Sequence, residues 1–235
     1  MEKRYKTSEW DRLRKKWQQE HIDQYLRRVI DMPSTGYFYG GTPHYFTVFP
    51  HRDLFVLQIE NLLEIDFSEL DGDISLGSRM AGFHGLVNLA IEYKPEWGIQ
   101  MEEARFRLWD LPFLDIFVKA AYDGCGLGKI WFIDHNLKRR EDAPPYKEKS
   151  GSNEQNAFYA SDRKLLEVGC DSMATALKNW RYLDEVGGAQ DTDRSESSIC
   201  FVDELQSWIE DQYDPDDTEA EQAKCQFGLL GWDDL

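Results

Sequence analysis

Four polar side chains near the ends of predicted strands have the chemical types that acid and base catalysis requires. Glu60, Glu92, Asp134 and His135 each lie at the end of an apolar, strand-like run, and ligand sites in open α/β sheets gather at the carboxyl ends of strands. Asp134 and His135 are the best-placed pair for proton transfer. Adjacent residues on a strand point to opposite faces, so a surface turn is the favoured interpretation and a catalytic pocket is the alternative.

Motifs that would bind a metal ion or a phosphate group fail on their context. No His has a second His or a carboxylate at the spacing of a zinc motif, and residues 71–75 begin like a calcium loop without its later Gly and Glu. Gly124–Gly128 follows a predicted helix and precedes a strand, whereas a phosphate loop follows a strand and opens a helix. We therefore expect no catalytic residue at these motifs, no metal ion and no cofactor.

The C-terminal segment combines large apolar side chains with an acidic setting. Such side chains supply the contact area of protein interfaces, and acidic residues steer the approach of a partner. We expect another protein to bind here. In the alternative interpretation the same side chains pack on the chain's own core, and the sequence leaves both open. The residues concerned are Trp208, Phe227, Leu229, Leu230 and Trp232.

The charge balance argues against two classes of partner. The formal net charge of −17 would repel nucleic acid and anionic membranes. The charge is unevenly distributed, because residues 1–30 are net basic and residues 184–221 are strongly acidic. No apolar run approaches the roughly 20 residues that cross a bilayer. We expect a soluble protein whose partner is another protein, and the oligomeric state stays open.

The cysteines indicate a reducing compartment. They are far apart, contain no C-x-x-C pair, and no apolar leader follows Met1. We therefore expect a cytoplasmic or nuclear protein in which these side chains are buried thiols rather than metal ligands. The four are Cys125, Cys170, Cys200 and Cys225.

Three β-rich runs alternate with helical segments and predict the fold class. The spacing of the strands suits β-α-β crossovers in one sheet. We predict an α/β fold, with α+β as a possible variant, built of β-α-β units in a mixed or parallel sheet; a short, irregular leucine-rich-repeat-like solenoid is one version of it. Strands are expected at 54–59, 87–93 and 129–134, and helices at 76–83 and 101–122, the second broken at Pro112.

Composition divides the chain into three regions. Residues 1–32 hold an N-terminal amphipathic helix, residues 37–186 form the α/β core domain, and residues 187–235 form an acidic linker, helix and tail. The remaining expectations are a loop at 136–155, short strands at 157–159 and 164–168, and helices at 172–184 and 199–213.

Four short motifs follow one another along the chain: PHYFTVFPHRDLFVLQ, GLVNLAIEY, KIWFIDHNLKRRED and FYASDRKLLEV. Together they resemble the fungal two-EXR domain family, whose members have an F-box-like start, and the likeness covers residues 44–168. The family's aromatic line is matched by Phe49, Pro50, Asp53 and Phe55, while its first Glu-x-Arg segment is absent from this sequence. The resemblance implies a fungal intracellular protein without assigned catalysis.

These observations favour a non-catalytic protein-protein interaction module. Its contacts would be the large apolar side chains of the acidic C-terminal segment. An enzyme with a site near Asp134 and His135 is the alternative from a different class. A truncated family member without its own activity is a third hypothesis.

Overall fold

The computed structural model describes 11 stretches of the chain. The predicted N-terminal helix within residues 1–32, the predicted helix at 76–83 and the glycine-rich segment at 124–128 lie outside them. The described residues are 34–39, 43–49, 52–65, 67, 88–104, 107–123, 129–146, 156–169, 173–184, 196–211 and 225–235.

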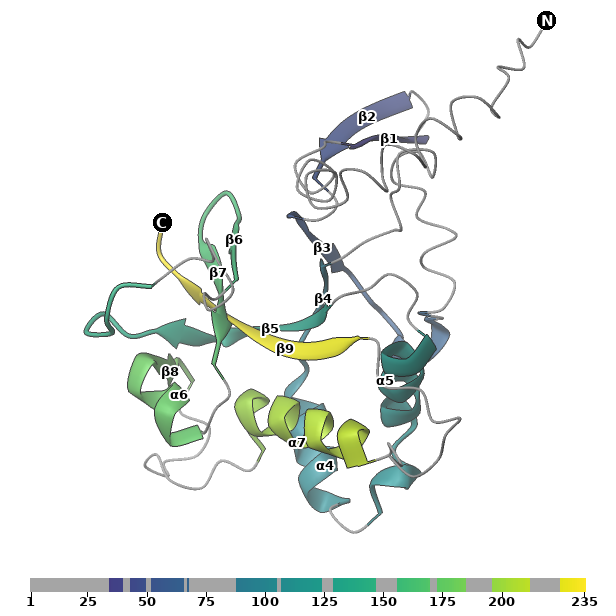
Figure 1. Ribbon diagram of the computed structural model, residues 1–235, viewed down its shortest axis with the longest axis vertical. Coiled ribbons are helices and arrows are strands. Elements are labelled where there is room, and N and C mark those ends of the chain that lie inside the picture. The colour runs from purple at the N-terminus through teal and green to yellow at the C-terminus, as the bar shows by residue number, and fades with distance from the viewer. Residues whose placement is uncertain are drawn as a thin grey trace, which may run out of the picture.

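A mixed sheet forms the body of the described structure (Figure 1). Its main path runs β3-β4-β5-β9-β7-β6, and β8 pairs with β5 beside this path. Strands β3, β4, β5 and β9 are parallel, whereas the pairs β9-β7, β7-β6 and β5-β8 are antiparallel. The predicted α/β class with a mixed sheet is confirmed. The strands are β3 (Leu54–Leu57), β4 (Asn88–Glu92), β5 (Lys129–Arg139), β6 (Ala157–Tyr159), β7 (Lys164–Val168), β8 (Trp180–Tyr182) and β9 (Gln226–Asp233).

A separate antiparallel pair precedes this sheet in the chain. It consists of β1 (Ser34–Tyr39) and β2 (Pro43–Val48), with Tyr37 paired to Tyr45. The short connection between β2 and β3 is held by Asp53, whose carboxylate accepts a hydrogen bond from the Phe49 backbone N–H at 2.8 Å.

Helices cover one face of the mixed sheet, and Figure 1 shows α7 (Ser198–Asp211) and α4 (Pro95–Glu103) beneath β9. The α-helices are α4 (Pro95–Glu103), α5 (Pro112–Asp123), α6 (Met173–Asn179) and α7 (Ser198–Asp211), and short 3-10 turns form η1 (Leu62–Glu64) and η3 (Leu108–Asp110).

The helical stretch expected at 101–122 is two helices. Pro112 is the first residue of α5, so the expected break at this proline is confirmed. Pro95 occupies the first turn of α4, six residues before the expected start. Both prolines are tolerated there because the first N–H groups of a helix have no intrahelical partner.

An aromatic cluster fills the space between the sheet and the helices. Phe132 on β5 contacts Phe117 of α5 and Phe201 of α7 edge to face, with ring centroids 5.2 and 5.1 Å apart. Trp97 of α4 joins them at 6.0 Å from Phe132, and Phe227 of β9 lies 5.9 Å from the same ring. Each such pair adds about 0.5–1.5 kcal/mol beyond the burial of its area, so the cluster fixes the three helices on the sheet.

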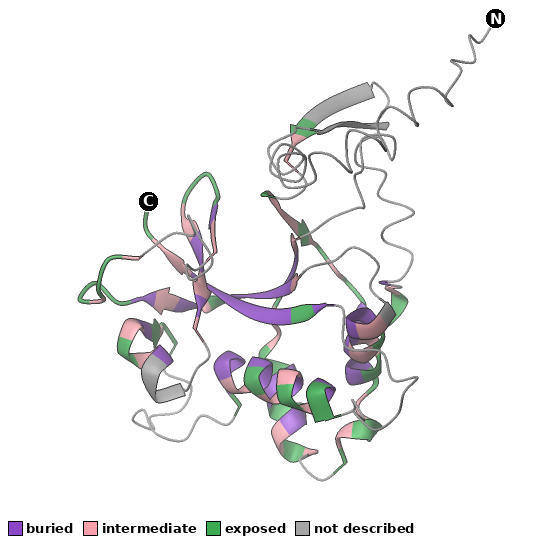
Figure 2. Ribbon diagram, viewed as in Figure 1, coloured by how far each residue is buried: buried purple, intermediate pink, exposed green. Residues whose placement is uncertain are grey.

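The C-terminal strand lies inside the sheet rather than in a tail. β9 pairs with β5 on one side and β7 on the other, and Figure 2 shows both β5 and β9 buried along most of their length. Residues 187–235 therefore contribute α7 and β9 to the same core as residues 37–186. The expected division at residue 187 does not correspond to a division of the sheet.

Other boundaries differ from expectation because tertiary pairing extends or ends the elements. β5 continues to Arg139, into the predicted loop at 136–155, because β8 pairs with its end from Leu137 to Arg139. The helix expected at 172–184 stops at Asn179 for the same reason, since the next residues form β8. The short strands at 157–159 and 164–168 are confirmed.

Two glycines on β9 allow tryptophan rings from nearby strands to pack directly against its backbone. A Cβ atom at Gly228 would collide with the ring of Trp131, and one at Gly231 would collide with the ring of Trp180. The second would also lie 2.9 Å from the Leu137 carbonyl oxygen. Backbone cannot yield as a flexible side chain does, so position 231 requires glycine.

We predict that Gly231→Ala lowers the free energy of unfolding by about 1–3 kcal/mol, the usual cost of overpacking a filled core. Chemical denaturation followed by fluorescence measures this loss. Gln226→Ala is the matched control, because residue 226 is exposed on the same strand and should change stability by less than about 0.5 kcal/mol. Equal stability of the Gly231 variant and the unmodified chain would contradict the close packing.

Candidate functional site

A buried polar cluster lies around Asp134 in the middle of β5, just after the last residue of β5 that pairs with β4, and not at the end of a strand as the catalytic alternative expects. Asp134 is 6% exposed and Ser198, the first residue of α7, is 1% exposed. The Ser198 hydroxyl lies 2.5 Å from Asp134 Oδ2, and the Asn136 backbone N–H donates to Asp134 Oδ1 at 2.8 Å. The Tyr182 hydroxyl from β8 lies 3.1 Å from Ser198 Oγ.

Burial changes the acidity of this cluster. Desolvation raises the pKa of Asp134, and the hydrogen bond from Ser198 offsets part of that effect. Burial also raises the pKa of the Tyr182 hydroxyl, with the nearby Asp134 charge adding to it. The Tyr93 hydroxyl, which donates to the Glu196 carbonyl at 3.2 Å, has its pKa raised by burial as well.

This cluster joins elements that are distant in the chain. Both carboxylate oxygens of Asp134 already accept a hydrogen bond, one from its own strand and one from α7. The cluster thus ties the start of α7 to β5, and Tyr182 extends the connection to β8. Its geometry is that of a structural hydrogen-bond network rather than that of a base positioned to take a proton from a substrate.

His135 lies on the opposite face of the sheet from Asp134. Its Nε2 is 3.5 Å from Glu92 Oε1, and both side chains are more than half exposed. Glu60 is exposed in the segment after β3 and does not line the hollow that holds Glu92 and His135. The structure therefore brings two of the four candidate catalytic residues together and separates them from the other two.

The five residues proposed as partner contacts belong mainly to the interior. Phe227 is 5% exposed, and Leu229 and Leu230 have no exposure, because β9 is an inner strand. Trp208 is partly buried against the core from α7. The interpretation that fits these positions is packing on the chain's own core.

Trp232 differs from the other four because it reaches the edge of the buried region. Its indole N–H donates to the His135 carbonyl at 2.8 Å. Lys138 and Arg163 lie over its ring, 4.5 and 5.0 Å from a ring centroid. These contacts hold the indole in place between β5 and β7.

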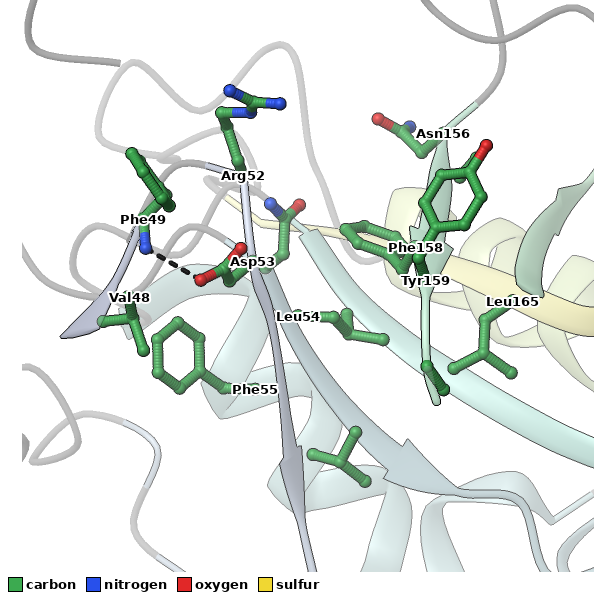
Figure 3. A pocket seen from close by; sticks show the side chains of 14 residues that line it. Val48, Phe49, Arg52, Asp53, Leu54, Phe55, Asn156, Phe158, Tyr159 and Leu165 are labelled. Carbon is green, nitrogen blue, oxygen red and sulfur yellow. Dashed lines mark hydrogen bonds between the residues drawn. The ribbon is translucent and has the colours of Figure 1, made fainter. Parts of the chain in front are cut away.

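A groove lies beside the two edge strands of the mixed sheet (Figure 3). Its larger part has a volume of about 1030 Å³ and is bounded by β3 and β6. A second hollow of about 500 Å³ continues from it toward Glu92 and His135. Val56, Ala160 and Leu165 line both parts, so we treat them as one feature, the edge groove.

Apolar side chains face one another across the middle of the edge groove, and polar residues make up much of the rest of its lining. Leu54 and Val56 of β3 face Phe158 of β6 and Leu165 of β7 across it. Figure 3 labels Leu54, Phe158 and Leu165 on the two sides. Val56 remains 43% exposed, which is high for a large apolar side chain on a strand. Arg52 and Asn156 lie toward one end, and the Glu92–His135 pair lies at the other.

Near the edge groove, a charged contact joins β5 to β7. Lys129 Nζ lies 4.2 Å from the centroid of a Trp131 ring and 2.8 Å from Glu167 Oε1. Asn156 donates two further hydrogen bonds to Glu167 Oε2, from its backbone at 2.8 Å and its side chain at 2.7 Å. These bonds lower the pKa of Glu167 although burial opposes them. Strands β5, β7 and the start of β6 are thereby locked together.

Sequence reasoning missed the edge groove as a site. One signal was available, because the four residues of β3, Leu54 to Leu57, are apolar on both faces of the strand. Phe55 and Leu57 pack toward the helices, while Leu54 joins the smaller cluster on the other face. The position of β6 across from β3 depends on the whole sheet and has no local signal.

The chain matches no known protein family, no curated protein and no solved structure at a significant level. In the part of the chain that the structure describes, no three His, Cys, Asp or Glu side chains gather as they would around a metal ion. No helix among the same residues is long and apolar enough to cross a membrane.

We predict a pH-dependent effect of Asp134→Asn on stability. Because burial raises the pKa of Asp134 above its ordinary 3.8, the folded state holds this proton more tightly than the unfolded state. The protonated Asp134 carboxyl therefore stabilises the unmodified chain fully below about pH 3.8. This stabilisation is lost as the pH rises through the pKa of Asp134 in the folded state. Its free energy of unfolding, minus that of the variant, should fall with rising pH in urea denaturation.

Asp162→Asn is the control with the opposite sign. The hydrogen bond from Arg163 lowers the pKa of the exposed Asp162, so the same difference should rise with pH, although screening keeps it small. A difference for Asp134 that is flat or rises with pH would show that its carboxyl is not destabilised by burial.

Proposed function

We propose that this chain is a non-catalytic protein-protein interaction module whose partner binds in the edge groove. The observation that carries the proposal is the groove itself, which reaches about 1030 Å³ in its larger part and leaves Val56 43% exposed on an apolar wall. Small-molecule sites occupy about 300–1,000 Å³. A space at the upper end of that range, extended by a second hollow, suits a segment of a polypeptide.

The enzyme alternative has less support. It needs Asp134 and His135 in one pocket, and these side chains lie on opposite faces of β5. A buried carboxyl with a raised pKa is a common mark of a catalytic acid or base. Here its two oxygens are engaged by Ser198 and by the backbone of Asn136, which favours a structural role.

The edge groove replaces the C-terminal segment as the proposed binding surface. Phe227, Leu229 and Leu230 would have to leave the sheet before they could contact a partner. Trp232 stays relevant because it pairs with Leu165, a residue that lines both parts of the groove.

Family and location remain part of the same proposal. A fungal two-EXR domain relationship, a cytoplasmic or nuclear location and a truncated member without its own activity are all compatible with a binding module. A leucine-rich-repeat-like arrangement is not supported, because the antiparallel strands β7 and β6 complete the sheet that β3, β4, β5 and β9 begin.

The test is quantitative affinity purification from the source cells with mass spectrometry, using the full chain and Val56→Asp. A charge on the groove wall would be desolvated by an apolar partner, so we expect the substitution to reduce a stoichiometric partner at least tenfold. A chain cut after Asp184 is unsuitable, because it lacks α7 and β9 and with them part of the core.

Ile99→Asp is the matched control. Ile99 is a β-branched residue on α4 that is 38% exposed, close to the exposure of Val56, and it lies away from the groove. Circular dichroism must show that both variants are folded. A partner that the two variants lose equally, or no partner for any form, would contradict binding in the edge groove.

A further inference from the structure

The edge groove separates the two ends of the mixed sheet. Among the described residues, β3 pairs only with β4 and β6 pairs only with β7, so these strands are the two edges of the main path. Both nevertheless line the same hollow, and Figure 3 shows them on opposite sides of it. The curled sheet thus brings its own two edges to face each other across an open space.

The groove borders the main chain of both edge strands. Side chains alternate between the faces of a strand, so a hollow on one face touches every second residue. Here consecutive residues line it, from Leu54 to Val56 on β3 and from Ala157 to Tyr159 on β6. Such a pattern arises when the hollow lies beside a strand, where the main-chain N–H and C=O groups of an edge point outward.

The apolar wall has the repeat of a strand. Leu54 and Val56 lie two residues apart on β3 and are in register with Asn88 and Ala90 of β4. A strand placed beside β3 would present its own alternate side chains to this wall at the same spacing. An α-helix presents side chains rather than main-chain donors and acceptors, so it would leave the strand edge unused.

The charge of the groove lining favours a basic partner segment. At the far end of the groove, His135 Nε2 lies 3.5 Å from Glu92 Oε1, and Asp162 pairs with Arg163 at 2.6 Å. With His135 neutral, as in the formal net charge of −17, three acidic and two basic residues line the two parts of the groove, so the lining carries a net charge of −1. A negative lining on an acidic chain attracts a basic sequence.

We infer that the edge groove binds an extended segment of a partner protein that adds to β3 as a further strand, with alternate apolar side chains and basic residues flanking them. This inference rests on the proposed function and specifies the occupant of the same site. Main-chain hydrogen bonds to β3 provide affinity, and the wall formed by Leu54, Val56 and Phe158 selects the side chains.

Fluorescence anisotropy with the full chain tests it. The probe is a labelled peptide of alternating valine and threonine with a lysine pair at each end. A second peptide carries N-methyl groups on those backbone nitrogens that would face β3, and a third has glutamates in place of the lysines. We expect the N-methylated and the glutamate peptides each to bind at least tenfold more weakly at low salt, and Val56→Asp to weaken the first peptide at least tenfold while Ile99→Asp does not.

Each result that differs from this expectation contradicts a different part of the inference. If N-methylation has no effect while Val56→Asp still weakens binding, the groove is a binding site but strand addition is wrong. If the glutamate peptide binds as well as the lysine peptide, the basic occupant is wrong. If sedimentation shows that the chain dimerises and Val56→Asp abolishes the dimer, a second copy is the occupant. If no peptide binding responds to Val56→Asp and no cellular partner does, the proposed function fails as well.

Discussion

The insertion of β9 between β5 and β7 is the interaction on which the rest of the structure depends. On one side it continues the parallel series, and on the other it starts the antiparallel series that ends in β6. Side chains of β9 pack on both faces of the sheet. Phe227 and Leu229 belong to the core between the sheet and the helices, and Leu230 packs on the opposite face. The two glycines on β9 make this insertion possible by leaving room for Trp131 and Trp180. Without β9 the β6-β7 pair would lose its connection to β5, and the edge groove would lose one wall.

The alternation of side chains along β5 divides the polar chemistry of the molecule. Asp134 turns inward, where Ser198 and the Asn136 N–H satisfy its oxygens, and His135 turns outward to Glu92. A single strand therefore supplies a hydrogen-bond network to the core and, through His135, a polar contact to the groove. The two sets lie on opposite faces, one in a position to fix α7 and the other at the surface.

The sequence predicted the elements whose signals are local. The runs at 54–59 and 129–134 are apolar and β-branched or aromatic, and both form strands. The helix at 198–211 was expected within two residues, since its apolar positions repeat at helical spacing. The segment at 226–233 is predicted only as part of an acidic tail, with packing on the chain's own core left open; its two glycines weaken the local strand signal, and its pairing with β5 and β7 explains why it forms a strand. The edge groove was missed for a related reason, since it depends on how far the sheet curls between β3 and β6, a property of seven strands together.

The position of β9 also has a consequence for how the chain is made. Every strand that β9 contacts precedes it, and the long stretch between Val168 and Gln226 must be synthesised before the gap between β5 and β7 can close. At about 5–20 residues per second this takes several seconds, during which the nascent chain carries two open strand edges. Open edges are templates for pairing with other chains. The ribosome-bound intermediate is thus the form of this protein most exposed to aggregation, and the interval before residue 233 emerges is when a chaperone has the most to protect.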